Sequence, residues 1–208
     1  MEVLRQAGAS VVGDALGRMG GVSGLNRYDC GHACLVARAF TVETRAGDNL
    51  AIHVALGRAQ AGDVLIVAGG HCLERALVGD LSRSYAIQRG MSGFVIDGAV
   101  RDVAAFRGPE PFACFARGTS HRGPSKEGPG RIGSPVAIGG QVICTGDIVV
   151  ADEDGLVCFD ASRLDEVTNL VAARLAAEAS MRAEISTGKP RQSWIEASVA
   201  KWERLVGT

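Results

Sequence analysis

The segment GFVIDGAVRDVAAF, residues Gly93 to Phe106, decides how the middle of the chain folds. Its apolar run, Phe94 to Ile96, is followed by Asp97-Gly98, which predicts a buried strand that ends in a turn. Arg101 and Asp102 then stand side by side where a helix-like segment begins. Sites of α/β proteins collect where strands end and helices begin, so this charge pair marks a candidate site.

Strand-like and helix-like segments alternate on both sides of this stretch. The patterns predict helices over residues 8–21 and 48–62 and from about Asp80, and strands over 33–44, 63–70 and 111–120. A Gly- and Pro-rich loop, 121–135, precedes short antiparallel strands over 135–159, and helices follow over 161–187 and 193–205. ADEDG, residues 151–155, favours a hairpin turn over a metal site. This order predicts a layered α/β or α+β domain.

Composition sets limits on the class of protein. The chain has 208 residues with a net charge of -1, which fits one domain and argues against a dedicated nucleic-acid binder. No apolar run approaches the roughly 18 residues of a membrane helix, and the N-terminus does not resemble a secretory signal. We therefore expect a cytoplasmic protein with no membrane partner. Its six cysteines should be reduced, and CGHAC, residues 30–34, is a weak metal motif whose thiols are expected to be structural.

Several mechanisms lack their motifs. The chain has neither a phosphate-binding G-x-x-x-x-G-K-[ST] loop nor a G-x-S-x-G elbow, and its four histidines form no H-x-x-x-H pair. The three lysines are Lys126, Lys189 and Lys201, so a Schiff-base mechanism has few candidates. Lys126 is interpreted as a charged loop residue in preference to a Schiff-base lysine.

Two acidic positions acquire a meaning when they are taken together. Asp80, after Gly79, and Asp102 could each simply cap a helix, and that interpretation stays open. However, the helix start at Asp80 also offers the free amides of Leu81 and Ser82, which bind carboxylates well. Arg101 adds a forked donor for a carboxylate, and Asp102 adds an oxygen ligand suited to Mg²⁺ or Mn²⁺. A carboxylate clamp beside a hard-metal ligand predicts a site for a small 2-oxo acid.

The chain also resembles a known family over about residues 10–188. The segments that carry the resemblance are GDALGRMGGVSGL, GDNLAIHVAL, GDVLIVAGG, RALVGDLS, GFVIDGAVRDVAAF, FARGTSHRGPSKEGPG and GDIVVADEDGLV. They are similar to the class II 4-hydroxy-4-methyl-2-oxoglutarate / 4-carboxy-4-hydroxy-2-oxoadipate aldolases. That family includes ribonuclease E inhibitor proteins and proteins once labelled demethylmenaquinone methyltransferase. Its functional signature is D-x20-R-D, here Asp80 to Arg101-Asp102.

The resemblance implies an α+β fold of the layered β/β/α swivelling type, assembled as a homotrimer or hexamer. It implies that Asp102 holds Mg²⁺ or Mn²⁺ and that Arg101, with the amides at Gly79, Leu81 and Ser82, grips the pyruvate part of the substrate. Asp80 would support catalysis.

A further acidic residue would approach the metal's waters from the C-terminal helix of a neighbouring subunit, and Glu178 fits that position best. The implied reaction is cleavage of a 4-hydroxy-2-oxo diacid to release pyruvate, with oxaloacetate decarboxylation through the same enolate.

The resemblance leaves alternatives. The second hypothesis is a non-enzymatic regulator that binds a ribonuclease, and a methyltransferase is the third and weakest. Residues 1–188 are expected to form a single aldolase-like domain. The C-terminal helical tail, 189–208, is longer and more aromatic than compact members would have, and we expect it either to contact a neighbouring subunit or to shape the choice of substrate.

Overall fold

The computed structural model describes residues 1–31, 34–188 and 192–207. The chain divides into two compact units, Met1–Val171 and Ala172–Thr208. The first unit contains the β-sheet. The second contains most of α5 (Leu164–Ser186), which follows a short 3-10 turn, Ala161–Arg163, and the whole of α6 (Ser193–Val206). The boundary predicted at residue 188 remains a prediction.

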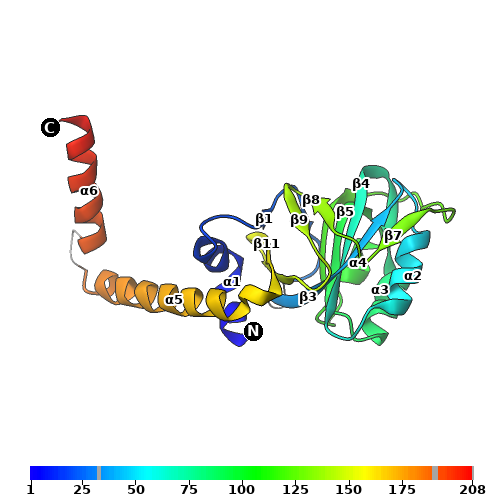
Figure 1. The fold of residues 1–208 in the computed structure, drawn as a ribbon, viewed down its shortest axis with the longest axis horizontal. Coiled ribbons are helices and arrows are strands. Elements are labelled where there is room, and N and C mark those ends of the chain that lie inside the picture. Colours follow the sequence, from blue (N-terminus) through cyan, green and yellow to red (C-terminus); the bar gives the residue numbers. More distant parts are fainter. Residues whose placement is uncertain (32–33, 189–191, 208) are drawn as a thin grey trace. The chain divides into compact units, whose positions relative to one another are not determined.

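A mixed sheet organises the first unit (Figure 1). In the described part of the chain it has nine strands, in the order β1-β11-β10-β3-β4-β5-β6-β2, with β7 paired to β3. Their bounds are β1 Gly21–Val22, β2 Asn26–Arg27, β3 Leu35–Thr44, β4 Asp63–Val78, β5 Gly93–Val100, β6 Ala113–Thr119, β7 Gly130–Ile132, β10 Ile148–Asp152 and β11 Gly155–Phe159. Neighbours β3, β4, β5 and β6 run parallel, and the outer pairings are antiparallel.

Both faces of the parallel strands are buried. Helices α2 (Leu50–Arg58), α3 (Asp80–Gln88) and α4 (Val103–Phe106) share one core with residues such as Leu65 and Phe94. The hairpin of β8 (Val136–Ile138) and β9 (Gln141–Ile143) shares the other core with Val64 and Val95. Neighbouring residues on one strand thus enter opposite cores, as the two-residue period of a strand requires. The predicted α+β layering of β on β on α is confirmed.

The first helix begins earlier than its sequence pattern suggested. α1 spans Glu2–Ala15 and packs on β10 and β11, but Gly8 interrupts it with φ 75° and ψ 175°. The break exposes the Ala9 N–H, which donates to Asp152 Oδ2 at 2.8 Å. A Cβ at position 8 would lie 2.5 Å from the same oxygen, so glycine is required on both counts.

The turn predicted at Asp97-Gly98 is wrong. β5 continues through both residues to Val100, and every residue of the strand is buried. Asp97 can lie inside because Arg117 pairs with it and His71 Nε2 lies 3.3 Å from Oδ2. Gly98 is needed for close packing instead of turning, since a Cβ there would lie 3.2 Å from the Cys72 carbonyl oxygen.

The predicted strand over 63–70 is also too short. β4 runs from Asp63 to Val78 and passes through the Gly69-Gly70 pair. Its pairing with β5 shifts register between Val67 and Val78. β4 therefore contains more residues than β5 over this stretch, although both strands end at the same edge of the sheet. Glycines that looked like a strand end therefore belong to an irregular part of the strand.

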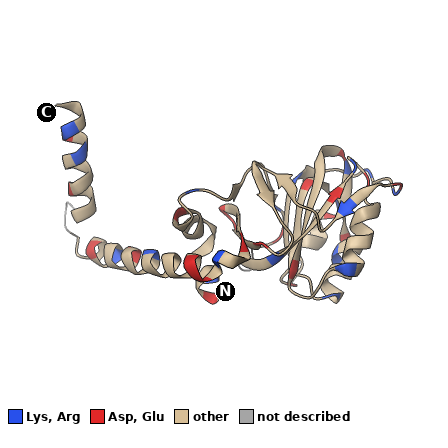
Figure 2. Cartoon of the chain, viewed as in Figure 1, with Lys and Arg blue, Asp and Glu red and all other residues tan. Residues whose placement is uncertain are grey.

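The hairpin turn expected at residues 151–155 is confirmed, since an antiparallel hairpin joins β10 to β11 with Asp152 opposite Gly155. Figure 2 shows acidic and basic residues interspersed along the chain. In the described ranges, no helix has the length and apolar character needed to cross a membrane.

Phe106 anchors the short α4 that follows Arg101-Asp102. Its buried ring meets Phe94 edge-on at 6.4 Å, and Phe112 lies 4.9 Å from Phe94. We predict that Phe106→Ala lowers the free energy of unfolding by about 3–5 kcal/mol, since it leaves a cavity, and that Phe106→Leu costs clearly less. Urea unfolding measures both. Equal small losses would show that α4 is not anchored by this ring.

Candidate functional site

The candidate site lies where four parallel strands end. Since β3, β4, β5 and β6 point the same way, the segments after their carboxyl ends meet at one edge of the sheet. These segments carry Asn49 after β3, Gly79-Asp80 after β4, Arg101-Asp102 after β5 and Lys126 in the loop after β6. Positions that are far apart in the sequence are thereby placed together.

Asp80, Arg101 and Asp102 come together as the sequence predicted. The backbone N–H of Asp80 donates to Asp102 Oδ2 at 3.1 Å, and Arg101 Nε lies 3.6 Å from the same oxygen. Gly79 permits this approach, because a Cβ there would lie 2.5 Å from Asp102 Oδ2 and 2.8 Å from Arg101 Cγ. Its φ of -155° suits any residue, so space and not backbone freedom requires glycine.

Asp102 does not cap its own helix. It precedes α4, but its side chain makes no capping hydrogen bond there and instead accepts from the first residue of α3. Its backbone is left-handed, with φ 55° and ψ 41°, a conformation that costs roughly 1–2 kcal/mol for most non-glycine residues. Strained residues of this kind cluster at functional sites, which weakens the simple capping interpretation.

The N-terminus of α3 supplies anion-binding amides. Asp80, Leu81 and Ser82 occupy its first turn, where backbone N–H groups have no partner within the helix. The Asp80 N–H is taken by Asp102, while Arg83 N–H bonds back to the Gly79 carbonyl. The amides of Leu81 and Ser82 thus remain in the position expected of carboxylate donors. The Asp80 carboxylate is near Ser84, whose Oγ lies 3.4 Å from Oδ1.

Arg101 lines two pockets at this edge. One pocket has a volume of about 90 Å³, and its lining includes Asn49, His53, Gly79, Leu81, Ser82 and Lys126. The other has a volume of about 310 Å³ and is lined by Arg101, Asp102, Val103, Thr119, Ser120 and His121. Arg101 therefore shares one pocket with Leu81 and Ser82 and the other with Asp102.

The structure adds residues that the sequence analysis did not assign to the site. Lys126 lines the Leu81 pocket, so its interpretation as a plain loop residue is incomplete. His53 lines it too, and its pKa is lowered by burial and then by the charge of Lys126. His53 follows Asn49 by one helical turn, so the i, i+4 spacing in DNLAIH was the available signal.

Asp48 fixes the loop that carries Lys126. This fully buried carboxylate accepts hydrogen bonds from the backbone of Leu50, Glu127 and Gly128 and from Ser125 Oγ, at 2.7–3.1 Å. Burial by itself raises the pKa of Asp48, but these donors outweigh it and lower the pKa to about 2. Asp48 thus accepts from the first N–H of α2 and also holds the loop that carries Lys126.

Glu178 lies on the part of α5 in the second unit, where it pairs with Arg182 at 3.2 Å. Its role at a metal remains a prediction. The weak motif CGHAC falls partly outside the described residues, at His32 and Ala33, and all six cysteines are free thiols.

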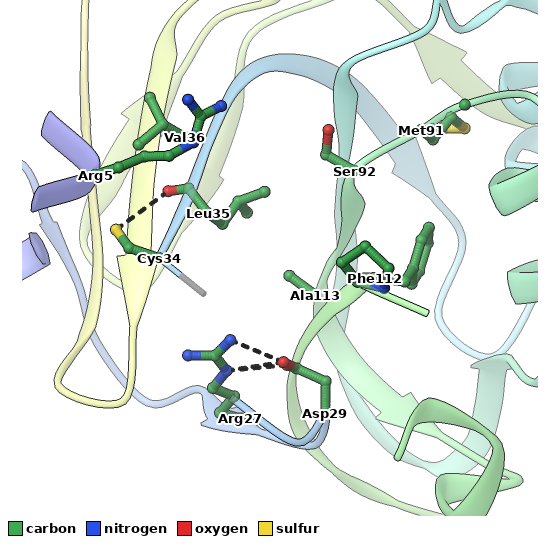
Figure 3. Close-up of a pocket in the computed structure, with 12 residues that line it drawn as sticks. Arg5, Arg27, Asp29, Cys34, Leu35, Val36, Met91, Ser92, Phe112 and Ala113 are labelled. Atoms are coloured by element: carbon green, nitrogen blue, oxygen red, sulfur yellow. Dashed lines mark hydrogen bonds and ion pairs between the residues drawn. The ribbon is translucent and has the colours of Figure 1, made fainter. Parts of the chain in front are cut away.

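A further pocket of about 320 Å³ lies near the amino ends of β5 and β6 (Figure 3). Arg27 and Asp29 form an ion pair there at 2.8 Å, so each charge is already neutralised by the other and is less suited to bind a substrate. Burial, then the charge of Asp152, raises the pKa of Cys34 to about 11, which keeps this thiol protonated at neutral pH. The carboxyl-end pockets are therefore the better site.

The Asp48 network generates a prediction on pH. A carboxylate with a lowered folded-state pKa stabilises the fold above its ordinary pKa, and this contribution is lost as the pH falls from about 4 to about 2. We expect Asp48→Asn to cost about 1–3 kcal/mol of unfolding free energy at pH 7, with the difference from the unmodified protein shrinking below pH 4. Urea unfolding between pH 3 and 7 measures it. A difference that stays constant with pH would contradict the assignment.

Comparisons with known proteins show which family the chain resembles. The RraA-like family, described as Aldolase/RraA, matches residues 9–158. A protein of Halalkalibacterium halodurans named "Putative 4-hydroxy-4-methyl-2-oxoglutarate aldolase" is 39% identical over 134 residues, 64% of this chain and 63% of that protein. The match thus spans less than two thirds of that relative's length.

Two solved structures share the fold. The RNA-processing inhibitor RraA from Thermus thermophilis is 30% identical with a TM-score of 0.65, over 72% of this chain and 90% of that one. An unusual member of the RNase ES inhibitor RraA family, from Streptomyces coelicolor, is 25% identical with a TM-score of 0.76, over 87% and 94%. Together with the match over residues 9–158, these likenesses confirm the resemblance seen in the sequence: the chain belongs to the RraA-like family.

Proposed function

We propose that this protein is a divalent-metal-dependent aldolase that cleaves a 4-hydroxy-2-oxo diacid and releases pyruvate, with oxaloacetate decarboxylation as a related activity. The observation that carries the proposal is the cluster around Gly79, where the Arg101 guanidinium, the α3 amides and the Asp102 carboxylate meet. The name of the Halalkalibacterium relative supports the aldolase class.

The donor set fits Mg²⁺ or Mn²⁺. The described residues hold no group of three or more His, Cys, Asp or Glu side chains able to enclose a metal, so a closed zinc-type site has no support there. Mg²⁺ usually keeps several waters and uses one or two protein carboxylates together with its substrate. Asp102, with its side chain 48% exposed, suits that role, and Glu178 of a neighbouring subunit is proposed to reach the waters. When bound, such a metal polarises the 2-oxo group as a Lewis acid.

The protein's own groups then bind and orient the substrate. Arg101 and the amides at Gly79, Leu81 and Ser82 are proposed to hold the pyruvate carboxylate, which suits a planar forked donor next to a helix N-terminus. Lys126 lines the same pocket and offers a second cation for the distal carboxylate of a diacid. Arg101 also faces the negative charge that develops on the pyruvate enolate, and Asp80 supports this arrangement. No lysine needs to react covalently.

The second candidate is a regulator that binds a ribonuclease, which the names of the two RraA structures favour. A trimeric or hexameric assembly is part of the aldolase proposal, since Glu178 would act across subunits. An enzyme needs Asp102 for activity, whereas a binding module does not. The two candidates therefore differ in what an Asp102 variant does.

The first experiment measures pyruvate release from 4-hydroxy-4-methyl-2-oxoglutarate and from oxaloacetate, with Mg²⁺ or Mn²⁺ and with EDTA. We expect activity with metal and none with EDTA. Asp102→Asn should lower kcat/KM at least about 100-fold, because the ligand charge is lost while asparagine tolerates the left-handed backbone. Arg101→Ala should cause a loss of about 10²–10³, while metal binding by calorimetry persists.

The exposed residues Arg58 and Asp165 provide matched controls, since Arg58→Ala and Asp165→Asn change the same side-chain types away from the cluster. Both should retain activity. Absence of pyruvate release from the unmodified protein with either metal would refute the aldolase. Ribonuclease inhibition that survives Asp102→Asn would instead establish the regulator.

A second test uses the close approach at Gly79. Gly79→Ala should push Asp102 Oδ2 and Arg101 Cγ away from the α3 start, and it should lower kcat/KM at least about tenfold, since small misplacements at a reacting centre are costly. Gly57→Ala is the control, because a Cβ there meets nothing within 4 Å. If both variants had unmodified activity, the cluster would not be the active site.

A further inference from the structure

Asn49 is a polar residue of the candidate pocket and has no role in the proposed reaction as described above. It is the N-cap residue of α2 and is only 5% exposed. It nevertheless lines the same pocket as Ser82, Arg101 and Lys126. The oxygen and the nitrogen of a buried amide normally have hydrogen-bond partners. An atom that lacks one in the folded chain is a candidate to bind a ligand.

The orientation of the Asn49 amide is fixed by its surroundings. Nδ2 donates to the Leu77 carbonyl oxygen at 3.0 Å. A carbonyl can only accept, so the nitrogen of the amide must be the atom that faces Leu77. The other atom is therefore the oxygen, Oδ1, and the described residues offer it no hydrogen bond.

The backbone keeps this oxygen in place. Asn49 N–H donates to the Ser125 carbonyl at 3.0 Å, and the Asn49 carbonyl accepts from His53 N–H at 3.1 Å. The neighbouring Asp48 binds the same loop through Ser125 Oγ and the N–H groups of Glu127 and Gly128. A side chain held at its nitrogen and on both sides of its backbone cannot turn to satisfy Oδ1 elsewhere, so the oxygen is a preorganised acceptor.

The chemistry of the substrate identifies the missing donor. A 2-oxo diacid at neutral pH presents two carboxylates and a ketone, and all of these oxygens only accept hydrogen bonds. The 4-hydroxyl group is the substrate's one O–H donor. We propose that Asn49 Oδ1 accepts the hydrogen bond of the substrate's 4-hydroxyl group and so selects hydroxylated 2-oxo diacids. This inference rests on the proposed aldolase function and adds a residue that determines specificity.

The test compares two substrates on one variant. Asn49→Ala should lower kcat/KM for 4-hydroxy-4-methyl-2-oxoglutarate about tenfold more than for oxaloacetate, which lacks this hydroxyl; tenfold corresponds to the loss of one hydrogen bond of about 1.4 kcal/mol. Any general loss of folded protein affects both substrates alike and cancels in the ratio. An equal fall for both substrates, as expected if Oδ1 holds only a water or supports the fold, would overturn the proposal.

The unmodified protein gives a measurement that does not depend on the folding of a variant. 4-Methyl-2-oxoglutarate, the same diacid without the hydroxyl, should inhibit with a Ki at least about tenfold above the KM of the hydroxylated substrate. A Ki equal to that KM would count against hydroxyl recognition. If the unmodified protein acted on neither substrate, the aldolase proposal itself would fail. Activity with an unchanged substrate ratio in Asn49→Ala would remove the Asn49 inference and leave the aldolase in place.

Discussion

The parallel alignment of β3, β4, β5 and β6 is the constraint on which the rest of the site depends. Neighbouring parallel strands end at the same edge of the sheet. The segment that follows each strand therefore places a different chemical group at that edge. These groups are an amide after β3, a helix start after β4, a charge pair after β5 and a lysine-bearing loop after β6. An antiparallel arrangement would have sent alternate segments to opposite edges.

At that edge, the close approach at Gly79 brings the opposite charges of Arg101 and Asp102 to the start of α3. Gly79 has no side chain, so Asp102 and Arg101 can approach the start of α3. The N-terminus of α3 favours anions, and the Asp102 carboxylate accepts the hydrogen bond of the Asp80 N–H there. The next two amides, of Leu81 and Ser82, are left for a substrate carboxylate. The left-handed backbone of Asp102 opposes this arrangement. The burial of Phe106, four residues later, helps to hold it.

Stability and function are balanced differently at two adjacent residues. The Asp48 carboxylate accepts hydrogen bonds from Leu50, Ser125, Glu127 and Gly128, and these bonds fix the loop. At Asn49 the nitrogen is satisfied and the oxygen is not, within the described residues. Folded proteins rarely leave such an acceptor without a partner, and functional sites are where this rule is broken.

The sequence by itself determined the layered α+β fold, the antiparallel hairpins and the residues of the charge cluster. Periodicity and turn chemistry are local, and the D-x20-R-D spacing with its flanking segments was specific enough to indicate the family. The turn expected at Asp97-Gly98 was wrong. A glycine needed for packing against Cys72 cannot be told from a turn glycine without knowing which residues lie beside it.

Only the tertiary structure decided which residues share the pocket. Asn49 and His53 lie one helical turn apart, but Lys126 comes from a segment more than 70 residues later, and no local pattern joins it to them. The capping interpretation of Asp102 could likewise be weighed only once its oxygen was seen to accept from α3 and not from α4. Hydrogen bonds between distant segments depend on how the strands pair, and strand pairing is set by the packing of the whole sheet.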